Sequence, residues 1–563
     1  MGLKERNHKS FDTEKSKSLD AGNIEEALTA TGFGRYNFGL LLICSWTLQA
    51  MGMDLFGTSF VVAAAVCDLQ LTMQQRALLT AMPLVGVVTG AQLWGYISDT
   101  KGRRLTLVLS MSVGFVFAAL SSFAPDWKTM AVLKLISSTF NPHSMADSFA
   151  RCLVLPPSSC GSIHMCLFLN FLLYRSTSAS NSGAYTLLGE SCPERARGRS
   201  MLLCTCSLMC SQAVVAVFAY PILPLKFVYW IDFLSITYRP WRLLALVMSL
   251  PCAATACLLQ LYHESPKFLV SRGKTEQALE VLKKIYAINT GNSPSNFPIT
   301  KLIVDEDQTV AREDSFLKAM WEQTVALFRP PMLKETLRLF YLVTVIYMTG
   351  SGFILWLPYI MNNLFSVLEA GGGDGMNLCT VIRYSTGQTD GNHTMIPEPC
   401  NDTIQETTLL SAMMYGALAS SSNLILSLTC GGKKRVAMMG ILAMSAVAGV
   451  LLNLVRIPIA GGIFFFFFLM CALSMGILSV YFVELYPTHL RGMASCLSVM
   501  LGRSSAFLGV NAIGALISAN CEATFYGWSL LLLIRGPPPF ASNNFPPCGL
   551  CRRSTWKEDA PHS

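Results

Sequence analysis

The stretch GYISDTKGRR at residues 95–104 decides the fold, because it lies between two long apolar runs at residues 77–97 and 105–123. Its first glycine permits close packing between helices, and its second allows a tight turn. Its aspartate is a candidate for pairing with a basic residue or a helix amino terminus across a bundle. Its paired arginines are typical of a short cytosolic loop of a membrane protein. The residues with these roles are Gly95, Asp99, Gly102, Arg103 and Arg104.

Further apolar runs extend outward from this turn in both directions, and a helix needs about 20 apolar residues to cross a membrane. The runs cover residues 38–63, 77–97, 105–123, 201–220, 241–262, 337–360, 408–428, 436–454, 460–483, 493–518 and 526–534, with a broken run at 131–140 and 178–188. We therefore predict an all-α polytopic membrane protein made of two six-helix bundles. The expected divisions are a cytosolic segment (1–35), a first bundle (36–262), a cytosolic loop (263–335), a second bundle (336–534) and a polar tail (535–563).

The composition agrees with a chain that mostly avoids water. Hydrophobic residues make up 52% of the 563 residues and charged residues only 13%, against roughly 25% charged residues in soluble proteins. The net charge of +8 does not indicate nucleic-acid binding, since the basic residues form short clusters between apolar runs. The motifs of metalloproteases and serine hydrolases, H-E-x-x-H and G-x-S-x-G, do not occur, so we predict that the protein is not an enzyme.

The loops predict the orientation. Basic clusters follow the second, fourth and eighth runs, which places these loops and the amino terminus in the cytosol. The loop between the seventh and eighth runs then lies outside, and it holds the N-x-S/T acceptors Asn392 and Asn401. Cys379 and Cys400 share that loop and are a candidate disulfide pair in an oxidising lumen.

A repeated string indicates internal duplication. The pattern E-x-x-P-x-x-x-R-G begins at Glu190 and again at Glu484, with its arginines at Arg197 and Arg491. Repeated halves are common in transporters. From Gly102 to Glu190 is 88 residues, whereas the equivalent distance from Gly432 to Glu484 is 52.

The first half therefore holds about 36 extra residues, which we place at 141–177, inside the fourth span. An inserted or mispredicted segment and a long loop between two half-helices both remain open. The twelfth span also departs from the pattern, because Arg535 and three prolines follow it at once. Since proline ends helices, we predict a truncated last helix.

Residues 95–104 resemble the G-x-x-x-D-x-x-G-R-R signature of the major facilitator superfamily, although the second-half counterpart at 431–435 lacks the acidic residue. Residues 264–269, ESPKFL, resemble a motif of sugar and organic-ion porters, and the helix after it has an apolar face. Residues 25–36, with Met53 and Asp54, resemble the group of synaptic vesicle glycoprotein 2. The resemblance implies that the two glutamates and arginines of the repeated string, with the 95–104 turn, form a conformational gate.

Charged residues inside membrane spans are functional candidates, because burying them is costly. Asp54 is a candidate for binding a cation, for carrying a coupling proton or for a structural ion pair. Arg503 is a candidate partner for Asp54 or for an anionic substrate. Lys134 is near a helix end, which favours snorkelling to the membrane surface. Tyr347, Trp356 and Asn423 are candidates for lining a cavity or for packing between helices.

We predict a secondary transporter of a small organic solute, an organic ion or a sugar-like molecule, that works by alternating access near the midplane. A proton or cation is the candidate coupling ion, and we expect a monomer in the plasma membrane or in vesicles with no cofactor and no metal. Two alternatives stay open. The chain is a non-transporting vesicle glycoprotein with a regulatory role, or its interrupted spans make it a defective product.

Overall fold

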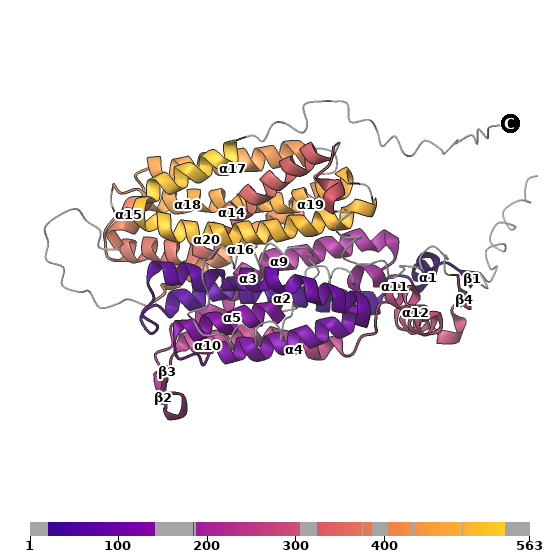
Figure 1. Cartoon of the computed structure of the whole chain (residues 1–563). Coiled ribbons are helices and arrows are strands. Elements are labelled where there is room, and N and C mark those ends of the chain that lie inside the picture. Colours follow the sequence, from indigo (N-terminus) through magenta and orange to yellow (C-terminus); the bar gives the residue numbers. More distant parts are fainter. Residues whose placement is uncertain are drawn as a thin grey trace, which may run out of the picture.

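The computed structural model of the chain describes residues 21–140, 184, 187–303, 324–330, 332–373, 375–385, 403–429, 434–486 and 488–534. Two bundles of long helices lie side by side (Figure 1). Within the described ranges, nine helices have the length and hydropathy needed to cross a membrane. The chain is therefore a multi-pass α-helical membrane protein, as the apolar runs predict.

The first bundle follows the predicted spans closely. It consists of α2 (Arg35–Ala64), α3 (Met73–Lys101), α4 (Arg103–Ser121), α5 (Trp127–Phe140), α9 (Glu194–Ile222) and α10 (Pro240–Leu259). Gly102 has a φ of 114° and separates α3 from α4. Pro240 begins α10, where its fixed φ and missing N–H suit the first helical position.

The second bundle repeats this arrangement. It consists of α14 (Leu333–Glu369), α16 (Glu406–Thr429), α17 (Lys434–Leu454), α18 (Pro458–Leu469) with η5 (Met470–Leu473) and α19 (Ser474–Leu485), and α20 (Thr488–Leu533), while the short α15 (Leu378–Ser385) lies outside it. The tenth predicted span thus bends through a 3-10 turn. Spans eleven and twelve form α20, which is interrupted at Asn520 (φ −153°, ψ 90°).

A small annex covers one end of the bundles, which we call the inner end; the opposite end is the outer end. The annex contains β1 (Ala21–Gly22), α1 (Ile24–Thr31), α11 (Pro266–Ser271), α12 (Thr275–Thr290), η3 (Pro294–Asn296) and β4 (Lys301–Leu302). β1 and β4 pair in parallel. α12 buries Ala278, Leu282 and Ile285 on one face. The loop after the first bundle thus packs against it through the predicted apolar helix.

The outer halves of the two bundles pack closely against each other. A Cβ on Gly416 of α16 would lie 2.4 Å from the Ala213 nitrogen of α9. A Cβ on Gly514 of α20 would lie 2.8 Å from the Ala77 side chain of α3. Glycines at these crossings let the backbones approach each other. These two contacts close the outer halves of the bundles against each other.

The two described ends of the fourth span both contact α2. The Ser138 hydroxyl donates to Asp54 Oδ2 at 2.8 Å, and the Asn37 amide donates to the Ser191 carbonyl at 2.8 Å. Along α2 the two contacts are 17 residues apart, about 26 Å at 1.5 Å per residue, but 53 residues of chain join Ser138 to Ser191. The surplus over a straight helix is again 36 residues. Residues 141–177 lie outside the described part of the chain, so the inserted segment itself stays a prediction.

The helix after Asn520 runs back along α14. Phe525 lies 5.1 Å from Phe353, centroid to centroid, and the Tyr341 hydroxyl donates to the Ile534 carbonyl at 3.4 Å. Tyr341 is eight residues inside α14, about 12 Å from its first residue. The described part of span twelve therefore stops about 12 Å short of the inner end of α14, where that helix begins. The tail at 535–563 lies outside the described residues.

The disulfide of the outer loop differs from the predicted pair. Cys379 of α15 is joined to Cys521, whose Cα lies 5.6 Å away, so the expected bond from Cys379 to Cys400 is wrong. The prediction chose Cys400 because it shares a loop with Cys379. In the fold, the turn after Asn520, which carries Cys521, lies against α15. Cys400 and the acceptors Asn392 and Asn401 lie outside the described residues.

This pairing predicts the result of peptide mapping. We expect a non-reducing digest, analysed by mass spectrometry, to contain a peptide linking Cys379 to Cys521. The Cys400→Ser variant should keep that peptide, because its sulfur is not part of the bond. A peptide linking Cys379 to Cys400 instead would contradict the assignment.

Candidate functional site

The first polar cluster lies inside the first bundle, around Asp54 of α2. Lys134 Nζ of α5 donates to Asp54 Oδ1 at 2.9 Å, and the Ser138 hydroxyl donates to Oδ2. The side chains of Lys134 and Asp54 are 3% and 7% exposed. Both carboxylate oxygens therefore have partners from one helix. The predicted snorkelling of Lys134 is wrong, because its ammonium lies inside the bundle, held by the buried carboxylate.

Arg503 of α20 does not pair with Asp54, its predicted partner, which is paired with Lys134 instead. Its guanidinium lies over the ring of Tyr347 in α14, 5.9 Å from the ring centroid. Arg503 is 9% exposed, and in the described part of the chain its Nε has no hydrogen-bond partner. The structure thus brings two predicted site residues, Arg503 and Tyr347, together in the second bundle.

Two buried glutamines of the first bundle, Gln49 and Gln212, were missed by the sequence analysis. Gln49 Oε1 of α2 accepts from the Ser207 and Ser211 hydroxyls of α9, both at 3.4 Å. Among the described residues, Nε2 of Gln49 and both amide atoms of Gln212 have no hydrogen-bond partner. These glutamines carry no charge, so a search for charges in membrane spans passes over them. Their signal is an amide in an otherwise apolar helix.

The position of Gln212 on α9 directs it away from the outside of the bundle. Gln212 is 2% exposed, whereas Leu203 and Val217 are 49% and 55% exposed. At 100° per residue, both leucine and valine lie on the far side of the helix from Gln212. The unpartnered amide therefore faces the interior of the protein.

The other predicted cavity residues contact neighbouring helices. Trp356 Nε1 donates to the Val510 carbonyl at 3.0 Å and is buried. The Asn423 amide lies 3.8 Å from Cys206 Sγ, and the Ser420 hydroxyl donates to the Cys206 carbonyl at 3.1 Å. Their described contacts therefore agree with the packing alternative.

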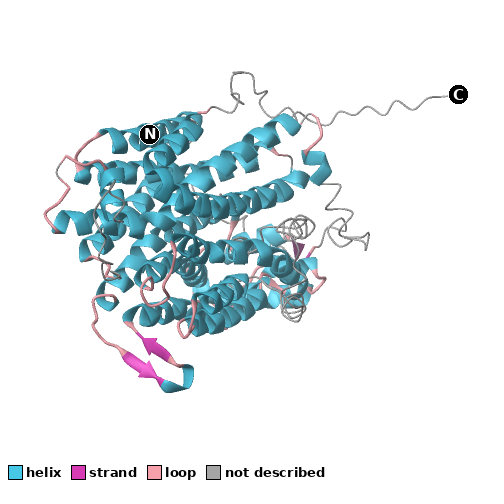
Figure 2. Cartoon of the chain, turned by 60° about the vertical axis from the view of Figure 1, so that its left-hand side comes forward, coloured by secondary structure: helices cyan, strands magenta, loops and turns pink. Residues whose placement is uncertain are grey.

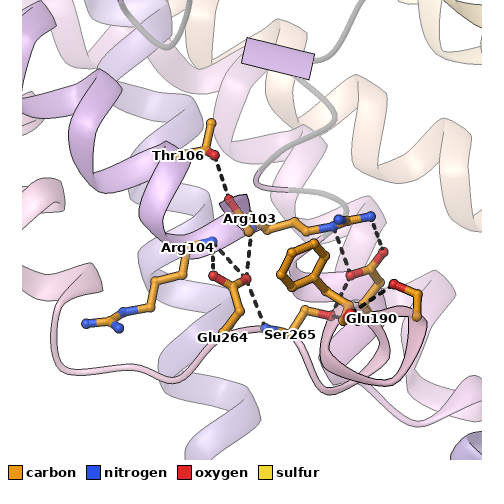
Figure 3. A network of polar contacts seen from close by, with 9 residues as sticks. Arg103, Arg104, Thr106, Glu190, Glu264 and Ser265 are labelled. Atoms are coloured by element: carbon orange, nitrogen blue, oxygen red, sulfur yellow. Dashed lines mark hydrogen bonds and ion pairs between the residues drawn. The ribbon is translucent and has the colours of Figure 1, made fainter. Parts of the chain in front are cut away.

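The motifs of the first half converge at the inner end (Figure 3). Arg103 Nε lies 3.3 Å from Glu190 Oε2, and Ser265 donates its hydroxyl to the same carboxylate. The Arg103 guanidinium also lies over the Phe268 ring, 4.8 Å from its centroid. The GRR turn, the repeated E-x-x-P string and the ESPKFL segment therefore form one network.

Glu264 caps α4 in this network. Its carboxylate accepts the backbone N–H groups of Arg103 at 2.8 Å and Arg104 at 3.0 Å, which satisfies donors that a helix start leaves free. The Arg104 guanidinium donates to the Gln260 carbonyl at 2.8 Å, near the end of α10. Gly102 is required here, because a Cβ would lie 2.4 Å from a Glu264 oxygen.

The annex is tied to the first bundle by a second carboxylate. Glu25 of α1 forms ion pairs with Arg197 of α9, at 2.9 Å, and with Lys267 of α11. Burial raises the pKa of Glu25, but the hydrogen bonds from Lys267 and Arg197 outweigh it and lower the pKa overall. Four gate candidates, Gly95, Asp99, Glu484 and Arg491, lie at positions whose side chains are outside the described part.

The chain is similar in sequence to known membrane transporters and vesicle glycoproteins. Residues 224–366 match the family model described as sugar (and other) transporter. Synaptic vesicle glycoprotein 2A of Rattus norvegicus is 24% identical over 62% of the chain, and glycoprotein 2C of Mus musculus is also 24% identical over 62%. These matches span 44% and 45% of the relatives' own lengths, so the chain corresponds to less than half of either relative.

Solved structures extend the likeness to most of the chain. The xylose transporter XylE of E. coli, in a partially occluded inward-open conformation, matches 89% of this chain and 96% of its own, with a TM-score of 0.56 and 14% identity. XylE described as a proton:xylose symporter matches with a TM-score of 0.53 and 16% identity. At these identities the likeness concerns the fold. The two bundles therefore have the fold of a major facilitator transporter, and residues 224–366 are similar to sugar transporters.

Proposed function

We propose that the protein transports a neutral polyhydroxylated solute by alternating access, with proton coupling through Asp54 and Lys134. The observation that carries the proposal is that the first bundle buries both two glutamines with unpartnered amide atoms and an ion pair. Amides both donate and accept hydrogen bonds, which matches the hydroxyl groups of a sugar. Buried polar groups without partners are uncommon in proteins, and a polar solute would supply partners here.

The ion pair supports coupling because its charges cancel only while Asp54 is ionised. A proton on Asp54 would leave the Lys134 ammonium unpaired inside the bundle, which is costly. Protonation would therefore favour a conformation in which Lys134 finds another partner or water. Such a difference between states is what allows a proton to bias a conformational equilibrium.

The closed outer halves of the bundles support an inward-facing conformation as one end point of the cycle. The Arg76 guanidinium of α3 lies 6.0 Å from the ring centroid of Tyr359 in α14. The Tyr220 hydroxyl of α9 lies 3.5 Å from the Glu406 carboxylate of α16. Both contacts join the two bundles near the outer end, and both would separate when the outer side opens.

The Asp54→Asn variant tests the coupling. An asparagine keeps a hydrogen bond to Ser138 but cannot release a proton in the working pH range. We expect uptake of radiolabelled sugars into proteoliposomes to lose its dependence on an imposed proton gradient, while sugar exchange at equal concentrations continues. The sugars are a hexose, a pentose and a polyol, each measured separately.

Asp126→Asn is the matched control, because Asp126 lies in the exposed turn before α5 and caps that helix. It should leave gradient-driven uptake unchanged. Gradient-driven uptake that survives in Asp54→Asn would refute the coupling role. Uptake of an organic anion in place of all three sugars would refute the substrate class and favour Arg503 as the recognition residue.

The similarity to synaptic vesicle glycoproteins supports a second candidate, a membrane glycoprotein that acts without transport. The same reconstitution separates the two candidates. Purified protein that binds no sugar in equilibrium dialysis and moves none across the vesicle would favour the second candidate.

A further inference from the structure

A β-hairpin joins α9 to α10 at the outer end of the first bundle. It consists of β2 (Tyr229–Ile231), the 3-10 turn η2 (Asp232–Leu234) and β3 (Ile236–Tyr238), with β2 and β3 paired antiparallel. Its register places Tyr229 opposite Tyr238. Neither the ion pair of Asp54 nor the hydrogen bonds of Gln49 to α9 involve this hairpin.

The base of the hairpin is fixed firmly to the bundle. Arg242, which is 2% exposed, donates to the Thr237 carbonyl of β3 at 3.0 Å and to the Ala124 carbonyl after α4 at 2.7 Å. Arg242 also pairs with Asp68 at 3.5 Å, as does Arg239 at 3.4 Å. The direction in which the hairpin projects is therefore set by buried contacts.

The tip of the hairpin exposes large apolar side chains. Phe233 is 94% exposed, Tyr229 66% and Trp230 62%. Apolar surface gathered at one place marks an interaction site rather than chance exposure. Asp232 is the only charged residue from 227 to 238, so the surface lacks the charge that would suit it to water.

The hairpin projects sideways from the bundle. In Figure 1 the helices run across the picture, and the hairpin hangs below α10 at their outer end. Figure 2 is turned about the vertical axis and still places the hairpin below the helices. The displacement is thus across the helix direction, which in a membrane is the direction along the bilayer surface.

The hairpin continues an apolar surface that lipid covers. On α4, Leu109, Val116 and Leu120 are 46%, 48% and 46% exposed, as expected for a helix face toward lipid. Leu120 lies in the last turn of α4, and Phe123 just after that helix packs against Tyr238 of β3, with 5.7 Å between the ring centroids. Tryptophan and tyrosine concentrate at the ends of spanning helices in membrane proteins, where their rings suit the boundary between headgroups and acyl chains.

We propose that the hairpin is an interfacial anchor: it rests on the bilayer beside α4 and α10 and inserts Trp230 and Phe233 among the lipid headgroups. The anchor fixes the height and tilt of the first bundle at its outer end. The second bundle can then move relative to a first bundle whose position in the membrane is fixed. The occupant is the lipid surface itself, not a soluble protein.

Fluorescence quenching by brominated lipid tests this contact. The chain has nine tryptophans, so the signal of Trp230 is the difference in emission between the wild type and Trp230→Phe. Both proteins are reconstituted into phosphatidylcholine vesicles with bromine either near the headgroup or near the chain end. We expect the difference signal to fall by more than half with bromine near the headgroup, and less with bromine at the chain end.

Two further variants examine the tip, with Trp230 kept as the reporter. Phe233→Asp should reduce quenching by headgroup-brominated lipid, whereas Ile288→Asp, at an exposed residue of α12 in the annex, should not change it. A difference signal that aqueous iodide quenches and brominated lipid does not would overturn the proposal in favour of a hairpin in water. A signal that neither quenches would overturn it in favour of a tip covered by this chain or by a second copy of it, and unchanged quenching in Phe233→Asp would contradict insertion of the tip.

Discussion

Replacing either Asp54 or Lys134 by alanine is expected to lower the free energy of unfolding by about 3–5 kcal/mol, the range for removing one partner of a buried ion pair. Each single variant leaves a charge inside the first bundle, where the side chains are 3% and 7% exposed. The double variant removes both charges and should recover much of the loss. Denaturant unfolding in detergent micelles measures all three.

Ser138→Ala is the companion variant for this cycle. It removes one hydrogen bond to Asp54 and leaves the ion pair intact, so we expect a loss of about 1.5–3 kcal/mol, as for a hydrogen bond to a charged group. If the losses from Asp54→Ala and Lys134→Ala simply add in the double variant, the two residues do not act as a pair.

The second large effect is expected at Gly102, where α4 begins. Gly102→Ala should cost about 3 kcal/mol, because a positive φ strains alanine by about 1–3 kcal/mol and the new Cβ displaces the Glu264 cap, which contributes about 1 kcal/mol. The Cβ would lie 2.4 Å from a Glu264 oxygen. The same denaturant titration measures the loss.

Gly273→Ala gives the cost of an alanine at a positive φ without a new contact. Gly273 has a φ of 72°, and a Cβ added there would meet no atom within 4 Å, so alanine at this position feels the backbone strain alone. Equal losses at Gly102 and Gly273 would show that the Glu264 contact adds nothing. Adding Glu264→Ala to Gly102→Ala should cost little more, since the contact is already lost.

The sequence was sufficient to predict the helices, because a span must be long and apolar whatever it packs against. It also marked the residues of the inner network, since the turn at Arg103 and the string at Glu190 have recognisable spacing. Contacts between spans were harder to predict from the sequence. Asp54 was singled out by its charge, but its choice of Lys134 over Arg503 depends on which helix lies alongside α2.

Two other misses have the same origin. Cys379 pairs with Cys521, 142 residues away, rather than with a cysteine of its own loop. Gln212 faces the interior only because α9 turns its Leu203 side outward. Both facts depend on the packing of helices, which hydropathy and motif spacing do not contain.

The two described ends of the fourth span are each fastened to the rest of the first bundle. Ser138 and Lys134 fasten its outer half to Asp54, while Ser191 fastens its inner half to Asn37. Both described ends are held by α2, at contacts 17 residues apart. The two described ends of this span therefore keep their places through contacts with α2, whatever the length of the chain between them.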